Sequence, residues 1–148
     1  MSIDATLIAP AQLAALQVTE PVVVIDTRDA DTFAAGHIPG TVLLDVRDVD
    51  EWYRFMKLST DGPVFKTPDE VLAECATAGI SSDDTVYMYC LKGARASNTF
   101  LALKQAGFTD VRMYFGSWNE WSRDDSLPIE TGLPVAKPSK QPALALAA

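Results

Sequence analysis

Cys90 opens a short segment whose residue types could carry out nucleophilic chemistry. The segment combines a thiol, two cations and a turn-forming glycine, and its six residues are Cys90, Leu91, Lys92, Gly93, Ala94 and Arg95. The apolar run at residues 85–89 predicts a buried strand before it, and residues 94–106 predict a helix after it. A turn between a strand and a helix N-terminus directs backbone N–H groups inward and favours bound anions. We therefore expect this segment, the Cys90 loop, to form an anion cradle.

The charge around the Cys90 loop favours a thiolate at Cys90 over the neutral thiol. Residues 90–112 contain four basic residues and one acidic residue, whereas the whole chain has a formal net charge of −8. Backbone amides, a helix N-terminus and nearby cations all stabilise a negatively charged sulfur. The sequence thus predicts that Cys90 is a nucleophile that attacks an electrophilic anion, and sulfur oxyanions and phosphate esters both fit that description.

The length of the Cys90 loop distinguishes these two substrate classes. Cysteine phosphatases place one more residue between the nucleophile and the arginine than the four that separate Cys90 from Arg95. The wider ring of amides fits a tetrahedral phosphate, whereas the shorter loop fits a persulfide sulfur. A sulfur substrate is therefore favoured, and phosphatase or arsenate reductase chemistry is the weaker alternative.

Further polar and aromatic residues follow the other predicted strands. Asp26 and Arg28 come directly after the strand predicted at residues 22–25, and Trp118 follows a later strand. The carboxyl ends of parallel strands share one edge of a sheet, so these side chains should face the Cys90 loop. We expect Asp26 and Arg28 to orient the loops by hydrogen bonds, and Trp118 either to join the core or to wall the pocket.

Each of three cationic or titratable residues can have either a structural or a functional role. His37, the sole histidine, has glycines close on both sides, which indicates a structural position in a turn rather than a general base. Lys92 is either a solvated loop residue or a ligand of the substrate anion. Arg95 either pairs with a carboxylate such as Glu120 or Asp26 or contacts the substrate.

Cys75 is the only other cysteine in the chain. It shares a face of a predicted helix with Val71 and Leu72, so we expect it to pack in the core rather than to act as a resolving thiol. Two cysteines are too few for a disulfide-stapled secreted domain, and their spacing is not that of a zinc site. No metal is therefore expected, and a reducing, cytoplasmic setting fits best.

Strand and helix signals alternate along the chain. Thr67, Pro68 and Glu70 form a capping box with proline at the first helical position, Gly79 marks the end of that helix, and another short helix can open at Asp48. Strands are predicted at residues 22–25, 41–44, 85–89 and 111–114. The alternation predicts an α/β fold, in which a mainly parallel central sheet is flanked by helices on both faces.

Length and composition are those of one globular domain. The chain has 148 residues, of which 48% are hydrophobic and 22% charged. Residues 1–132 are predicted to form the domain, and residues 133–148 a flexible tail rich in proline and alanine. The acidic excess argues against nucleic acid or an anionic membrane as a partner, and neither an export signal nor a membrane-spanning segment is expected.

The order of four motifs resembles that of the rhodanese family of sulfurtransferases. The motifs are VVVIDTR at residues 22–28, GHIPG at 36–40, YCLKGARAS at 89–97 and GSWNEW at 116–121. The likeness covers roughly residues 5–132 and is greatest to the catalytic half of two-domain thiosulfate sulfurtransferases. It implies a single rhodanese-like domain.

The resemblance also implies a two-step cycle at Cys90. The cysteine takes sulfane sulfur from an anionic donor, releases sulfite if the donor is thiosulfate, and passes the sulfur to cyanide, a thiol or a protein. The intermediate is a covalent persulfide, so no cofactor is required. The other five residues of the Cys90 loop would bind the substrate, and Lys92 matches a lysine of thiosulfate-preferring relatives.

Three positions depart from the family pattern. Pro39 stands where some relatives have an arginine, Thr32-Phe33 replaces an acidic residue, and Phe115 replaces an aspartate. These changes leave the thiolate in place but alter the expected polarity of the pocket. The alternative to an enzyme is a persulfide carrier or sensor module that exchanges sulfur with other proteins and does not turn over small donors.

Overall fold

The computed structural model describes residues 7–44 and 66–133 of the protein. Its central sheet contains four strands in the order β2-β1-β3-β4, and each neighbouring pair is parallel. The strands are β1 (Val23–Asp26), β2 (Val42–Leu43), β3 (Val86–Tyr89) and β4 (Val111–Met113). The boundaries of each strand lie within one residue of the predicted ones, and the predicted α/β fold with a parallel sheet is confirmed.

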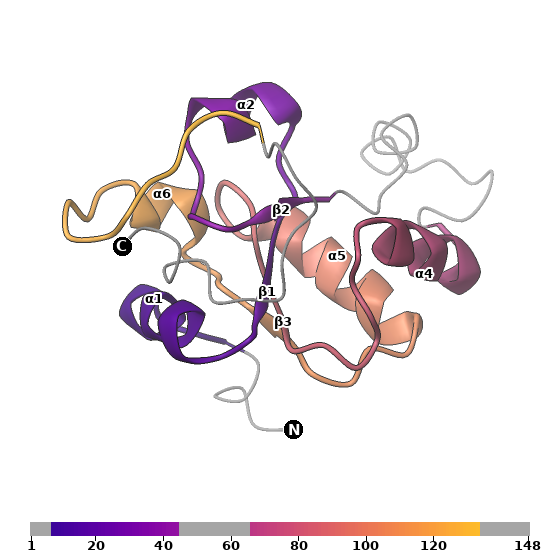
Figure 1. The fold of residues 1–148 in the computed structure, drawn as a ribbon. Helices are drawn as coiled ribbons and strands as arrows, with labels where there is room; N and C mark the ends of the chain where they lie inside the picture. The colour runs from indigo at the N-terminus through magenta and orange to yellow at the C-terminus, as the bar shows by residue number, and fades with distance from the viewer. Residues whose placement is uncertain (1–6, 45–65, 134–148) are drawn as a thin grey trace.

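Two predicted helices cover one face of the sheet, to the right of the strands in Figure 1. α4 (Pro68–Thr77) begins with the predicted capping box, in which the Thr67 N–H donates to Glu70 Oε2 at 2.8 Å. α5 (Ala94–Gln105) starts directly after Gly93. α4 therefore starts where the side chains of a capping box bind free backbone N–H groups, and α5 starts where a glycine bends the chain.

The remaining helices lie on the other side of the strands or above them in Figure 1. α1 (Pro10–Thr19) and α2 (Ala30–Ala35) are not among the predicted elements, although Asp29 accepts the N–H of Thr32 at 2.9 Å and so caps α2. α6 (Ser117–Trp121) is a short helix that contains the two tryptophans of the GSWNEW motif. The helix predicted to open at Asp48 and residues 134–148 of the predicted tail lie outside the described residues. No helix in the described ranges is long and apolar enough to cross a membrane.

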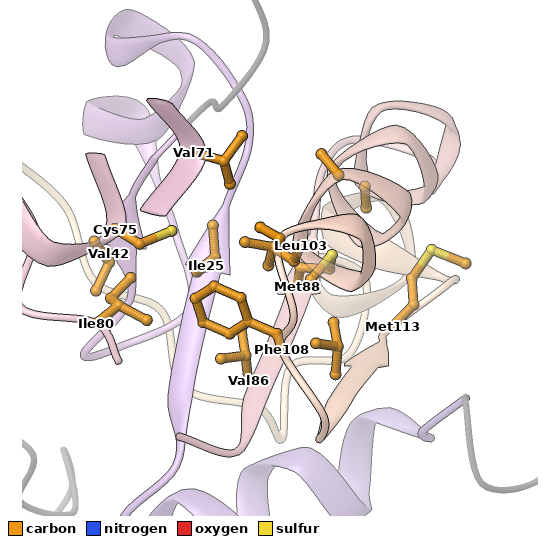
Figure 2. Packing of buried hydrophobic residues seen from close by; sticks show 14 of the residues in the cluster. Ile25, Val42, Val71, Cys75, Ile80, Val86, Met88, Leu103, Phe108 and Met113 are labelled. Carbon is orange, nitrogen blue, oxygen red and sulfur yellow. The ribbon is translucent and has the colours of Figure 1, made fainter. Parts of the chain in front are cut away.

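Alternate strand residues pack against helices on opposite faces of the sheet. The cluster that includes α4 and α5 contains Ile25, Val71, Val86, Met88 and Leu103 (Figure 2). The cluster that includes α1 and α6 contains Leu13, Val24, Tyr87, Tyr89 and Trp121. This period of two is that of a strand buried on both faces, and it confirms the prediction of helices on both sides of the sheet.

The parallel register brings the carboxyl ends of three strands together. Asp26 is the register partner of Tyr89, so the residues after β1 and Cys90 after β3 lie at the same edge of the sheet. The Tyr114 N–H donates to the carbonyl of Met88 at 2.9 Å, which brings the chain after β4 to this edge as well. This edge is where parallel sheets usually bind ligands.

Candidate active site

Cys90 is the first residue after β3, and its side chain is buried beneath the Cys90 loop. Only 2% of the residue is exposed, and its Sγ accepts the backbone N–H of Gly93 at 3.1 Å. An amide directed at sulfur stabilises negative charge there, because the amide hydrogen carries the positive end of the peptide dipole. The predicted cradle therefore has one donor on the sulfur in this structure.

Gly93 permits this contact because no other residue type fits its position. Its φ of 86° is in the left-handed region, where a side chain strains the backbone. A Cβ atom at Gly93 would lie 2.9 Å from the carbonyl oxygen of Phe115 and 3.0 Å from its ring. Glycine therefore provides both the turn into α5 and the close approach of the loop to residue 115.

The start of α6 binds the backbone of the Cys90 loop. The N–H groups of Trp118 and Asn119 donate to the carbonyls of Cys90 and Leu91, each at 3.0 Å. The Cys90 N–H donates to Ser117 Oγ at 3.2 Å. The sequence pointed to the Gly-Ser-Trp motif at this edge but did not single out Ser117, whose contribution depends on contacts between segments far apart in the chain.

Asp26 and Arg28 form a buried ion pair next to the site, with exposures of 0% and 3%. Arg28 Nη2 donates to Asp26 Oδ2 at 2.6 Å and to the carbonyl of Gly36 at 2.7 Å. Burial tends to lower the pKa of Arg28, but the hydrogen bonds and charge of Asp26 outweigh it and raise that pKa overall. The guanidinium lies 4.8 Å from the ring centre of Trp118, so this pair connects the loop after β1 to the start of α6.

His37 lies in a closely packed turn and is 3% exposed. Its ring stacks on Phe33 at a centroid distance of 3.7 Å, and Nδ1 lies 2.9 Å from the carbonyl of the same residue. Nε2 lies 3.5 Å from a carboxylate oxygen of Glu130, and the backbones of the two residues pair through a β-bridge. Both ring nitrogens thus face protein groups, and Glu130 is a partner that local sequence signals did not indicate.

Lys92 and Arg95 carry the positive charge of the Cys90 loop. Lys92 is exposed and Arg95 is half-buried, and within the described ranges neither side chain makes a hydrogen bond or an ion pair. Of the two carboxylates expected to pair with Arg95, Asp26 binds Arg28 instead, and Glu120 lies against the backbone at Gly116. That pairing is therefore not found, and the binding of a substrate anion by Lys92 and Arg95 stays a prediction.

One apolar side chain of the Cys90 loop and one that lies against the loop are exposed. Leu91 is 48% exposed and Phe115 is 58% exposed. The Phe115 ring lies against Gly93, as the contacts of a Cβ atom at that position show. Phe115 replaces the aspartate of the family pattern, so the outer wall of the loop is apolar where a carboxylate was expected.

Cys75 differs from Cys90 in its surroundings. It is fully buried in α4, and Figure 2 shows it among apolar neighbours such as Val42 and Ile80. Burial, followed by the charge of Glu74, raises the pKa of Cys75 to about 11. Val71 lies on the same buried face, but Leu72 is exposed, so the prediction that Leu72 shares this face was wrong.

The sequence profile of the rhodanese-like domain matches residues 9–124. The chain belongs to the rhodanese-like family, and its parallel sheet, with a cysteine at the carboxyl end of β3, agrees with that membership. Among the described residues no three His, Cys, Asp or Glu side chains gather into a potential metal site.

Two curated relatives indicate the range of names in the family. The thiosulfate sulfurtransferase of Corynebacterium glutamicum is 36% identical over 107 residues, which are 72% of this chain and 32% of the relative. The "probable 3-mercaptopyruvate sulfurtransferase" of Pseudomonas aeruginosa is 31% identical over an alignment of 141 residues, which covers 87% of this chain and 46% of the relative. The chain thus spans between about a third and about a half of these relatives.

A solved structure has the same fold. The anaerobic ergothioneine biosynthesis enzyme from Chlorobium limicola, in complex with trimethyl histidine, superposes with a TM-score of 0.71 at 21% identity. The superposition covers 90% of this chain and 33% of that enzyme. At this identity the likeness concerns the fold alone.

Proposed function

We propose that this chain is a sulfurtransferase that carries sulfane sulfur as a persulfide on Cys90. The observation that supports this proposal most directly is the Gly93 N–H directed at Cys90 Sγ at 3.1 Å, at the carboxyl edge of a parallel sheet. This geometry suits a sulfur that alternates between a thiolate and a persulfide, because both forms carry negative charge near an amide donor. The sulfurtransferase names of the relatives agree with this reaction class.

The first half-reaction loads the enzyme. The Cys90 thiolate attacks the outer sulfur of thiosulfate, a new S–S bond forms, and the bond to the sulfonate sulfur breaks. Sulfite leaves with the electron pair of the broken bond. In the second half-reaction a nucleophile such as cyanide or a thiolate attacks the outer sulfur of the persulfide, and the Cys90 thiolate returns. Electrons balance over the two steps without an added oxidant or reductant.

We propose thiosulfate as the donor because the Cys90 loop presents two cations whose side chains make no hydrogen bond or close ion pair within the described ranges, although the charge of Asp29 acts on Arg95. The exposed Lys92 and the half-buried Arg95 can bind the sulfonate group of thiosulfate. The carboxylate of 3-mercaptopyruvate is the competing anion. Because the proposed nucleophile must stay a reduced thiolate, we place the reaction in a reducing cytoplasm.

The proposal is tested by intact mass measurement after incubation with thiosulfate or 3-mercaptopyruvate, before and after treatment with a reductant. We expect thiosulfate to add one sulfur atom, which a reductant removes, and cyanide to convert the loaded protein to thiocyanate and free protein. Folded protein that gains no sulfur from either donor would falsify the proposal. Hydrolysis of an aryl phosphate that depends on Cys90 would instead favour phosphatase chemistry.

A persulfide carrier is the second candidate, and the exposed apolar side chains beside the loop favour it. Leu91 and Phe115 could contact a protein that delivers or receives sulfur, which a small acceptor does not need. A carrier would load and keep its sulfur but would show negligible turnover with thiosulfate and cyanide. The rate of thiocyanate formation therefore distinguishes the carrier from the enzyme.

A further inference from the structure

We infer that Ser117 is a positioning residue for sulfur transfer, because it places the start of α6 so that the loop amides next to Cys90 point toward the substrate. This inference rests on the function proposed above. It concerns a side chain that does not contact Cys90 Sγ in the structure and that acts through the backbone of the Cys90 loop.

Ser117 is held between two backbone segments. Its Oγ accepts the N–H of Cys90 at 3.2 Å and donates to the carbonyl of Tyr114 at 3.0 Å. The residue is fully buried, so these bonds do not compete with water. The hydroxyl thereby joins the first residue of the Cys90 loop to the first residue after β4.

The backbone of Ser117 is in an unusual conformation for a serine. Its φ is 57°, and it is the only residue other than glycine with a positive φ in the described part of the chain. Side chains rarely adopt this region, and such residues concentrate at functional sites. The turn at Ser117 directs the N–H groups of Trp118 and Asn119 back toward the Cys90 loop, where they bind the carbonyls of Cys90 and Leu91.

The direction of these carbonyls determines the direction of the neighbouring amides. In a trans peptide the C=O and the following N–H point in opposite directions, and the described residues contain no cis peptide bond. With the carbonyls of Cys90 and Leu91 directed at α6, the N–H groups of Leu91 and Lys92 must point away from α6. Neither amide has an acceptor in the described ranges, so both are available to an anion bound beside Cys90.

Two serine variants separate positioning from a purely structural role. Ser117→Gly removes the hydroxyl and suits the positive φ, whereas Ser117→Ala removes the hydroxyl and keeps the strained backbone. Ser97→Ala is a matched control, because Ser97 Oγ also donates to a carbonyl three residues earlier, that of Ala94 at 2.8 Å, but lies on the exposed surface of α5.

The first measurement is the rate of Cys90 alkylation by iodoacetamide as a function of pH, together with kcat and KM for thiosulfate and the melting temperature. We expect alkylation of Cys90 to be slower in both Ser117 variants, and kcat to fall roughly tenfold to a hundredfold, as for other misplaced catalytic groups. Ser117→Gly should melt close to the wild type, and Ser97→Ala should match it in every readout. An unchanged alkylation profile and kcat in folded Ser117→Gly would overturn the inference.

A second measurement uses the wild-type protein and does not depend on whether a variant folds. The backbone amide NMR signals of Leu91 and Lys92 should shift when thiosulfate loads sulfur on Cys90, and amide signals that stay fixed while the protein gains sulfur overturn the inference. The alkylation profile needs no sulfur donor. A protein that fails to load sulfur, but whose alkylation profile still responds to Ser117, therefore counts against the proposed function and not against the positioning role.

Discussion

The two cysteines of this protein are almost equally buried but differ in their surroundings. Cys75 is 0% exposed and Cys90 is 2% exposed, and both belong to the same apolar cluster. Cys75 lies within α4, where burial raises its pKa to about 11. Cys90 lies at the end of a strand, with the Gly93 amide 3.1 Å from its sulfur. Burial alone therefore does not distinguish the two thiols, whereas the amide donor beside Cys90 does.

The position of each cysteine in its element explains the availability of donors. The amides inside a helix are already bound to carbonyls of the same helix, so α4 has few to offer to Cys75. The first N–H groups of a helix have no partners within it. Cys90 comes just before α5, and the left-handed turn at Gly93 directs one such amide at its sulfur.

The largest expected effect comes from replacing each cysteine in turn. Cys90→Ser should lose both sulfur loading and turnover, because an alcohol at this position is a far weaker nucleophile than a thiolate. Cys75→Val should keep both, since this thiol lies in the core. Intact mass after thiosulfate treatment and the rate of thiocyanate formation measure the two effects. Loading that persists in Cys90→Ser would reverse the assignment and make Cys75 the sulfur acceptor.

Breaking the buried ion pair between Asp26 and Arg28 should have the next largest effect. Arg28→Ala leaves Asp26 as an unpaired buried charge and should lower the free energy of unfolding by about 3–5 kcal/mol. The comparison variant is Arg112→Ala, because Arg112 pairs with Asp110 at the same spacing with both side chains about 40% exposed, although it also donates to the Tyr87 hydroxyl at 3.0 Å. Exposed pairs contribute about 0–1 kcal/mol. Equal losses in urea unfolding of the two variants would show that burial of the Arg28 pair has no energetic role.

Gly93→Ala tests whether the amide on Cys90 Sγ depends on the left-handed turn. The added Cβ combines strained backbone with a 2.9 Å approach to the Phe115 carbonyl, so we expect a loss of about 1–3 kcal/mol in unfolding free energy and slower alkylation of Cys90. Gly79→Ala is the control, since its φ is also positive, at 79°, but a Cβ there meets nothing within 4 Å. It should lose stability without any change in thiol reactivity. Unchanged alkylation in Gly93→Ala would contradict this account.

The smallest effect concerns Cys75 and the pH dependence of stability. Burial raises the pKa of Cys75 from 9.0 to about 11, so between these values the folded protein keeps a proton that the unfolded chain has released. The contribution of this thiol to the free energy of unfolding is complete below pH 9 and is lost as the pH rises through 11. Near pH 10 the loss is about 1 kcal/mol.

Urea unfolding at pH 8 and at pH 10 measures this effect. In a Cys90→Ser background, which removes the other thiol, Cys75→Val should gain stability at pH 10 relative to the protein that retains Cys75. No gain would mean that Cys75 ionises as easily in the folded protein as in the unfolded chain.

Local signals in the sequence were enough to predict several helices and strands and the turn in the Cys90 loop. The Thr67–Glu70 capping box, the apolar run of β3 and the glycine before α5 act between residues close in the chain, and each is found where it was predicted. α1 has no side-chain cap at Ala9, but Pro10 at its first position and Gln12, which accepts the Ala9 N–H at 3.2 Å, were local signals that were not used. The capping residue of α2, Asp29, was present but was not used.

The tertiary structure alone decided which distant groups meet at the site. The bond from the Cys90 amide to Ser117 and the pairing of His37 with Glu130 both depend on how separate loops pack. By itself the sequence determined the short loop that follows β3 and predicted Cys90 as its nucleophile, because hydrogen-bonding and charge signals there act over a few residues. The residues that contact the Cys90 loop from other segments could be identified only from the whole sheet, because its parallel register brings together strand ends that are far apart in the chain.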